Sequence, residues 1–272
     1  MTNMLKKLTS VVFLLVFTMV VNGCAAKQET KSQAELDRSK DTVFQVSAIN
    51  ALLQGVYDGE ITCGELKKQG DLGIGTLDGL DGEMVALDGQ IYQVKSDGQA
   101  YVVGDEVSCP FAALTFFEKD GSRELKELAS YDNLQKSIDS MIVNPNLFYA
   151  VRIDGTFDYV KTRSVPKQSK PYRPLAEVTA SQPVFEFNNV KGTLVGFWCP
   201  KYIEGINVPG WHLHFLTADR KQGGHLLDCR LQEGTALVDE SADIHLALLK
   251  GSDFSQADLR TDRQKELEKV EK

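Results

Sequence analysis

The chain has 272 residues, of which 42% are hydrophobic and 25% charged, enough apolar material for one large domain or two small ones. Its 30 Lys and Arg residues against 38 Asp and Glu residues leave a formal net charge of −8. An acidic chain without a basic face lacks the charge that binds phosphate backbones, so we expect no nucleic-acid partner. The composition indicates a soluble, acidic, folded protein.

The N-terminal segment is predicted to lie outside the fold. An apolar run at residues 11–21 follows two lysines and is too short to span a bilayer comfortably, which is typical of an export signal. Cys24 closes a lipoprotein-type cleavage box, so we predict a signal peptide over residues 1–24 and lipidation of Cys24, with plain secretory cleavage near Ala25 as the alternative. Residues 25–40, rich in Lys, Gln, Glu and Ser, are expected to form a disordered tether. The protein is therefore expected to be exported and to touch the membrane only through a lipid anchor.

Four further cysteines are scattered widely along the chain: Cys63, Cys109, Cys199 and Cys229. An even number in an exported protein is compatible with disulfides. A chain of this length does not need such staples, however, and no CxxC pair indicates a thiolate metal site. We expect free or buried thiols.

The first half of the folded region mixes short helices with strands. In chain order the residues predict a strand at 43–48, helical segments at 49–56 and 65–68, tight turns over 70–82, a hairpin of 83–87 with 90–94, a strand at 112–117 and a helix at 131–142. Asp88 and Gly89, between the two hairpin strands, are the residues that a type I′ turn requires.

The second half is dominated by β-branched and aromatic alternation. Strands are predicted at 147–153, 156–165, 184–187, 192–198, 212–217, 225–231 and 244–249, a surface loop at 166–174 and a charged helix at 256–271. Hairpin-connected strands with few helices indicate an α+β fold with largely antiparallel sheets. We divide the chain into an α/β subdomain at 41–150 and a β-rich subdomain with a C-terminal helix at 151–272.

Three of the four histidines fall within fourteen residues and form a candidate metal site. His212 and His214 are two apart on a predicted strand, so their imidazoles point to the same face. A glycine-rich turn at residues 219–224 brings the next strand back, which places His225 beside them. Three imidazoles with a fourth position left open describe a catalytic zinc site, although copper, iron or nickel would also accept them. The fourth, His245, alternates within another strand and is predicted to be structural.

Two other functions fit part of this pattern. A cupin-like metal-dependent oxygenase or isomerase also begins with two histidines two apart on a strand, but it expects a Glu four or five residues after the second, where Ala218 and Asp219 stand. An exported zinc-binding lipoprotein without catalytic activity needs only the three ligands. If all three histidines bind metal, proton transfer must come from carboxylates or water, and the residues alone do not choose among the many Asp and Glu side chains.

Several motifs, in order and with matching spacing from about residue 43 to the C-terminus, resemble the alpha-acetolactate decarboxylase family. They read GDLGIGTLDGLDGEM at 70–84, RSVPKQ at 163–168, KGTLVGF at 191–197, VPGWHLHF at 208–215 and GGH at 223–225. The family usually has Phe in place of Trp211, a conservative difference.

The resemblance implies a zinc-dependent decarboxylation of 2-acetolactate to acetoin and CO2, in which the metal stabilises an enediolate that a glutamate protonates. It matches His212, His214 and His225 to the zinc ligands, Thr76 to a substrate contact, and three residues to catalytic positions: Glu83, Arg163 and Glu271. From the residues alone, these three also fit a hairpin glutamate, a surface arginine and a frayed helix end. The resemblance further implies a larger mixed N-terminal sheet, a smaller C-terminal sheet, and a homodimer.

Overall fold

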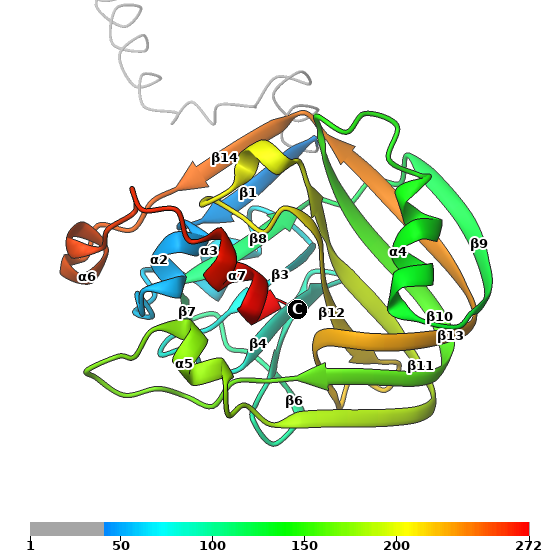
Figure 1. The fold of residues 1–272 in the computed structure, drawn as a ribbon, viewed down its shortest axis with the longest axis horizontal. Helices are drawn as coiled ribbons and strands as arrows, with labels where there is room; N and C mark the ends of the chain where they lie inside the picture. Colours follow the sequence, from blue (N-terminus) through cyan, green and yellow to red (C-terminus); the bar gives the residue numbers. More distant parts are fainter. Residues whose placement is uncertain (1–40, 272) are drawn as a thin grey trace, which may run out of the picture. The chain divides into compact units, whose positions relative to one another are not determined.

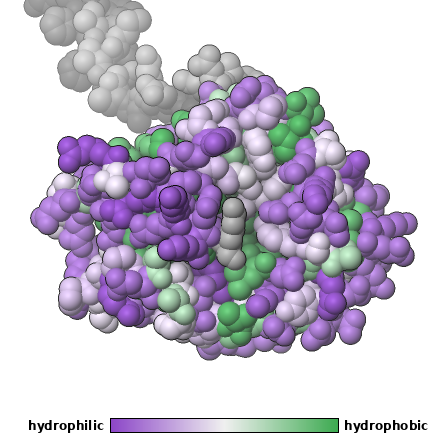
Figure 2. Space-filling view, in the orientation of Figure 1, coloured by the Kyte–Doolittle hydropathy of each residue, from purple (hydrophilic) through white to green (hydrophobic). Residues whose placement is uncertain are grey.

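A computed structural model describes residues 41–271, which belong to one compact unit (Figure 1). The predicted signal peptide, the tether and the lipidated Cys24 lie outside the described residues. Within residues 41–271, no helix is long and apolar enough to cross a membrane. The face drawn in Figure 2 is mostly hydrophilic, and its hydrophobic residues form small, separate patches.

The larger sheet has seven strands in the order β14-β1-β8-β3-β4-β5-β6. Their bounds are β1 Thr42–Val46, β3 Leu72–Thr76, β4 Glu83–Leu87, β5 Gln90–Val94, β6 Ala100–Val102, β8 Phe111–Thr115 and β14 Asp243–Ala247. β14 runs parallel to β1 and the other neighbours are antiparallel, so the sheet is mixed, as predicted. The β4–β5 turn is of the predicted type, since Asp88 and Gly89 both have positive φ angles of 54° and 75°.

The smaller sheet is antiparallel and contains β9 Gly121–Leu128, β10 Phe148–Arg163, β11 Val184–Cys199, β12 Gly210–Thr217 and β13 Gly223–Ser241. β10 pairs along its length with both β11 and β13, and β12 pairs with β11 and β13, so these four strands close on themselves. This closure places the ends of β10, β12 and β13 side by side. A small two-stranded sheet joins β2 Ile61–Thr62 to β7 Ser108–Cys109.

β10 and β11 are each one long strand where two were predicted, so the predicted breaks are wrong. Gly155 of β10 lies opposite Gly192 of β11 and Gly234 of β13. A Cβ atom at Gly155 would come 2.8 Å from the carbonyl oxygen of Glu233. Glycine here serves the close approach of neighbouring backbones rather than a turn.

The prediction of tight turns over residues 70–82 is wrong for its first half, which contains β3. Cβ atoms at Gly73 and Gly75 would lie 2.4 and 2.3 Å from carbonyl oxygens of β8, so these glycines are required by close strand contact. The turn itself follows β3, where Gly79, Leu80 and Gly82 adopt positive φ angles.

Short helices cover the sheets and the cavity between them. They are α2 Ile49–Leu53, α3 Cys63–Leu66, α4 Tyr131–Asp139, α5 Leu175–Thr179, α6 Ser252–Gln256 and α7 Gln264–Glu271, with a 3-10 turn at Lys201–Ile203. The single helix predicted at 256–271 is wrong. Asp258 and Asp262 accept hydrogen bonds from the backbone N–H groups of Arg260 and Gln264, and this local bonding competes with a continuous helix.

The two sheets pack face to face over a shared apolar core that includes Val43, Ile74, Ala150 and Phe197. Each sheet contains a strand from the other half of the chain, because β14 joins the larger sheet and β9 the smaller one. Cys63, Cys109, Cys199 and Cys229 are buried and form no disulfide among the described residues, as predicted. The fold is therefore α+β with two main sheets, which confirms the predicted class.

Candidate active site

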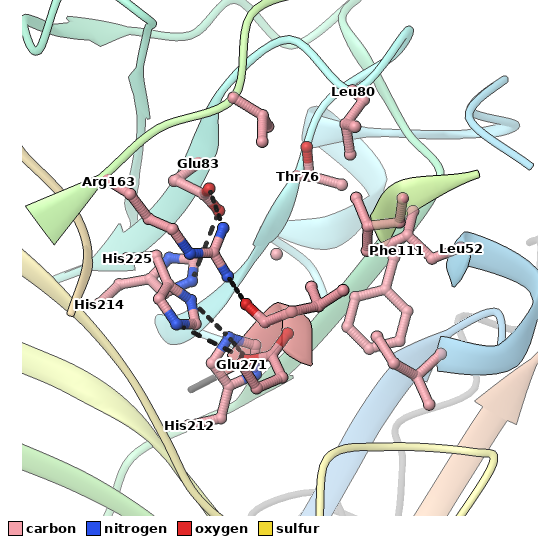
Figure 3. A pocket seen from close by; sticks show the side chains of 15 residues that line it. Leu52, Thr76, Leu80, Glu83, Phe111, Arg163, His212, His214, His225 and Glu271 are labelled. Atoms are coloured by element: carbon pink, nitrogen blue, oxygen red, sulfur yellow. Dashed lines mark hydrogen bonds and ion pairs between the residues drawn. The ribbon is translucent and has the colours of Figure 1, made fainter. Parts of the chain in front are cut away.

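One cavity lies where the ends of β10, β12 and β13 meet β3, β4 and β8 of the larger sheet (Figure 3). Helices α2, α5 and α7 enclose it, and α7 is in contact with α5. It is lined by polar residues on one side and apolar ones on the other: Thr76, Glu83, Arg163, His212, His214, His225 and Glu271 against Ile49, Leu52, Leu80, Phe111, Val165, Leu175 and Val270. Each residue predicted for the site, Cys24 apart, lines this single cavity.

Strand register brings the histidines together. His214 of β12 pairs with His225 of β13, which in turn pairs with Arg163 of β10, so the three form a row across the strands. His212 lies two residues before His214 and shares its face, while Leu213 and Phe215 point into the core of the smaller sheet. One ligand atom from each of the three histidines lies within 4.8 Å of those of the others.

The ring nitrogens are arranged as metal ligands require. His214 Nδ1 lies 2.9 Å from the carbonyl oxygen of Met84, which can only accept, so Nδ1 carries the proton and Nε2 keeps a free lone pair. That Nε2 atom is buried and has no hydrogen-bond partner within the part of the chain that the structure describes. His212 Nε2 and His225 Nδ1 face each other at 3.2 Å.

Burial also selects the neutral imidazole, the form that binds metals. Desolvation, with Arg163 adding to it, lowers the pKa of His212 to about 3. Desolvation lowers the pKa of His214 and His225 well below the usual value, and charges on Arg163 and the neighbouring histidines add to it. Three neutral, converging imidazoles with a free lone pair fit a divalent transition metal.

Two carboxyl groups, the buried Glu83 and the partly buried Glu271, flank the histidines from opposite sides. Glu83, the first residue of β4, has Oε2 3.7 Å from His214 Nε2. Glu271, at the end of α7, has Oε2 3.5 Å from His212 Nε2 and 3.7 Å from His225 Nε2. Burial raises the pKa of both carboxyls to about 7, and Arg163 opposes the shift in each case. Both groups can therefore hold a proton near neutral pH.

Arg163 connects the two carboxyl-bearing segments. Its Nη1 donates to Glu83 Oε1 at 3.3 Å and to Gln182 Oε1 at 3.2 Å, and its Nη2 donates to the Val270 carbonyl of α7 at 2.9 Å. The side chain is buried, and its Nε has no hydrogen-bond partner among the described residues. The Nε–H group of a fixed guanidinium is thus left for an anionic ligand.

Thr76 lies in the cavity, whereas His245 lies outside it. Thr76 ends β3 and lines the cavity, where its hydroxyl donates to the Gly82 carbonyl at 2.7 Å and so also braces the turn before Glu83. His245 lies on the edge strand β14, away from the cavity, and its ring contacts Phe44 edge-on at 5.1 Å between centroids.

Sequence reasoning missed three contributors to the site. The Met84 carbonyl orients His214, Gln182 binds Arg163, and a wall that includes Leu52 and Phe111 faces the histidines across the cavity (Figure 3). A backbone carbonyl leaves no signal in residue type. Gln182 lies between the loop predicted at 166–174 and the strand predicted at 184–187, where no element was predicted, and the apolar residues are indistinguishable from core residues by periodicity.

Fold and cavity define a two-sheet α+β protein with a candidate three-histidine metal centre. Comparison with known proteins gives the family. The family model described as alpha-acetolactate decarboxylase matches residues 43–261 of this chain. The chain belongs to this family, and it is a decarboxylase, a carbon–carbon lyase.

Relatives match over most of their lengths. An alpha-acetolactate decarboxylase of Methanosarcina mazei is 51% identical over 236 residues, which cover 87% of this chain and 82% of the relative. That of Bacillus licheniformis is 44% identical over 223 residues, which cover 82% and 88%. The crystal structure of the alpha-acetolactate decarboxylase from Bacillus subtilis strain 168 matches with a TM-score of 0.83 at 42% identity, covering 85% of this chain and 99% of that one. The predicted family is confirmed.

Proposed function

We propose that the protein converts 2-acetolactate to acetoin and CO2, and that it does so with a zinc ion held by His212, His214 and His225. The observation that carries the proposal is the convergence of three neutral imidazoles, two protonatable carboxyls and one arginine on a single cavity. When bound there, zinc supplies Lewis-acid stabilisation of negative charge on substrate oxygens. Zinc is preferred because three imidazoles with an open position are typical of its catalytic sites.

Arg163 has the geometry to orient the substrate carboxylate. Acetolactate carries this carboxylate β to a ketone, so its loss as CO2 leaves an enediolate. The unpaired Nε of Arg163 is buried beside the histidines and can donate to an anionic oxygen. Because the guanidinium is already held by Glu83, Gln182 and Val270, it needs little reorganisation when a substrate binds.

Glu83 and Glu271 are the candidate proton donors. Protonation of one face of the enediolate fixes the configuration of acetoin, so the donor must occupy a defined side of the cavity. The two carboxyls lie beside different histidines, Glu83 next to His214 and Glu271 next to His212 and His225. Burial keeps either group protonated to higher pH than an exposed glutamate.

A zinc-binding protein without turnover is the main alternative, and the structure offers a reason to disfavour it. Such a protein needs the three ligands only, whereas this chain also buries Arg163 and Glu83 beside them and places the partly buried Glu271 against them. Burying charged groups costs free energy, a cost that a protein needing only the three ligands would not have. A cupin-like oxygenase would require an oxidant and would not release CO2 from acetolactate anaerobically.

One assay separates these functions. Purified protein, with its metal content measured, is incubated with racemic 2-acetolactate under nitrogen while CO2 and acetoin are quantified. We expect equimolar CO2 and acetoin of one configuration, loss of turnover with a chelator, and its return with zinc. Stoichiometric zinc without acetoin would favour the binding protein, and turnover only in oxygen would favour the oxygenase.

We also propose that the protein is an exported lipoprotein and a homodimer. The basis is the N-terminal segment ending at Cys24 and the family resemblance. Replacement of Cys24 by Ala should move the protein from the membrane fraction to the soluble fraction of the producing cell. Light scattering of residues 41–272 should give twice the mass of one chain; a monomer would contradict the dimer.

A further inference from the structure

Gln182 stands outside the cavity but is bonded to its central arginine. Its side-chain oxygen accepts from Arg163 Nη1 at 3.2 Å, on the same nitrogen that donates to Glu83 Oε1 at 3.3 Å. Gln182 does not line the cavity, so any effect on the reaction passes through Arg163. It is the only one of the three Arg163 partners in the described residues that belongs to a loop.

The loop that carries Gln182 is fastened close to Arg163. The Gln182 N–H donates to the Thr179 carbonyl at the end of α5, at 3.3 Å. The next residue, Pro183, accepts from the N–H of Ser164 at 3.2 Å, and Arg163 itself pairs with Val184 of β11. The side chain therefore returns to Arg163 from a backbone anchored on both sides, which gives it little freedom to move away.

The charge of the partners is as informative as their position. Two of the three groups bound to Arg163, the Gln182 amide and the Val270 carbonyl, are neutral, and only Glu83 can carry a negative charge. A neutral acceptor at position 182 holds the guanidinium without cancelling its positive charge.

We propose that Gln182 is a positioning residue that holds Arg163 in place with a neutral acceptor, so that the positive charge of Arg163 remains free for the substrate carboxylate. This inference rests on the proposed decarboxylation of an anionic substrate. It predicts two different kinetic signatures, one for loss of the acceptor and one for addition of charge.

Gln182→Met removes the acceptor and keeps the length of the side chain. Arg163 should then reach the carboxylate but sample several orientations, so kcat should fall about tenfold while KM stays within about twofold. Gln182→Glu keeps acceptor oxygens and adds a negative charge. In this variant KM should rise about tenfold with a smaller change in kcat, because the carboxylate at position 182 offsets the charge that attracts the substrate.

A double-mutant cycle distinguishes positioning from a structural role. In an Arg163→Lys background, Gln182→Met should lower kcat by no more than about twofold, since the group that it positions is gone. Gln90→Met is the matched control. Among residues 41–271, the Gln90 amide bonds only to the Ile91 carbonyl, at the far end of β4 from Glu83, and the variant should keep wild-type kinetics.

An NMR measurement tests the same inference without turnover. With arginine labelled by ¹⁵N, the Arg163 Nε–H signal should show a high order parameter in the wild-type protein and a lower one in Gln182→Met. The proposal would be overturned if Gln182→Met lowered kcat by the same factor in the wild-type and Arg163→Lys backgrounds. Wild-type kinetics in both Gln182 variants, or an unchanged Arg163 signal, would also overturn it. So would lost metal or a lowered Tm in both variants, which would assign Gln182 a structural role. A wild-type protein that orders Arg163 yet makes no acetoin would instead contradict the proposed function.

Discussion

The candidate site has two parts that are held in different ways. The three histidines, Arg163 and Glu83 lie on strands, where backbone ladders of both sheets determine their positions. Glu271 lies on α7, a helix of eight residues that is too short to persist in water alone. That helix is held by two buried side chains, Leu267 and Val270, and by the bond from Arg163 to the Val270 carbonyl. Its C-terminal end is drawn in front of the strands in Figure 1, and Val270 and Glu271 line the cavity.

This difference implies that metal binding and helix-dependent turnover can be separated by mutation. A change on the strands removes a ligand from a rigid frame, whereas a change on α7 leaves that frame intact. The interface between the two parts is one apolar cluster, which also includes Ile49, Leu175 and Val178. The α7 side of the site therefore depends on side-chain packing and the metal side on backbone pairing.

The largest effect is expected on the strands. His212→Ala, His214→Ala or His225→Ala should each remove stoichiometric metal and bring decarboxylation below detection, because two imidazoles cannot hold a catalytic ion tightly. Metal analysis of the purified variants and the acetoin assay check this. His245→Ala, on the exposed edge strand β14, should change neither. If a variant with all three histidines replaced by alanine kept its zinc and its activity, the proposed site would be refuted.

A smaller but still large effect is expected at the end of α7. Deletion of residues 270–272 removes Glu271 and the carbonyl that binds Arg163, so turnover should fall about 100-fold or more, as for loss of a general acid. Zinc content should change little, and Tm should fall because the buried Val270 side chain is lost, whereas Glu271→Gln should lower turnover without that fall. A bulky C-terminal tag should also reduce activity. Full activity and unchanged product configuration after truncation would leave Glu83 as the proton donor.

Arg163 lies at the junction of the two parts. Arg163→Lys keeps the charge but loses the planar arrangement that binds Glu83, Gln182 and Val270 together, and we expect kcat/KM to fall about 30-fold. Zinc content should not change, since Arg163 is not a ligand. Wild-type kinetics in this variant would show that the hydrogen bonds of Arg163 to the two parts of the site do not affect turnover.

The smallest effect is expected from loosening α7 without touching its polar groups. Leu267→Ala removes a buried side chain worth about 2–3 kcal/mol of local packing, so the helix should detach more often and kcat should fall several-fold. Hydrogen exchange should quicken in α7 and stay unchanged in β12 and β13. Lys265→Ala is the control, because Lys265 is exposed on the same helix. If α7 were equally protected from hydrogen exchange in both variants, the packing of Leu267 would not be what holds the helix.

The parts that sequence predicted well are those decided by local spacing. Alternation placed His212 and His214 on one face, and Asp88-Gly89 identified its hairpin, because side-chain direction and turn geometry depend on neighbouring residues. Glycines misled twice, over residues 70–82 and at Gly155. A residue without a side chain is compatible with a turn and with close contact between strands, and only the neighbouring strand distinguishes them.

By itself, the sequence determined the histidine pattern, the hairpins, the α+β class and, through its motifs, the family. Only the tertiary structure decided that Glu83, Arg163 and Glu271, which are 80 or more positions apart, meet beside those histidines. It also decided the division of the C-terminal segment into α6 and α7, and the contact of Gln182 with Arg163. The physical reason is that strand pairing and helix docking join distant segments through register and apolar packing. The periodicity of one segment does not identify the segment with which it pairs or packs.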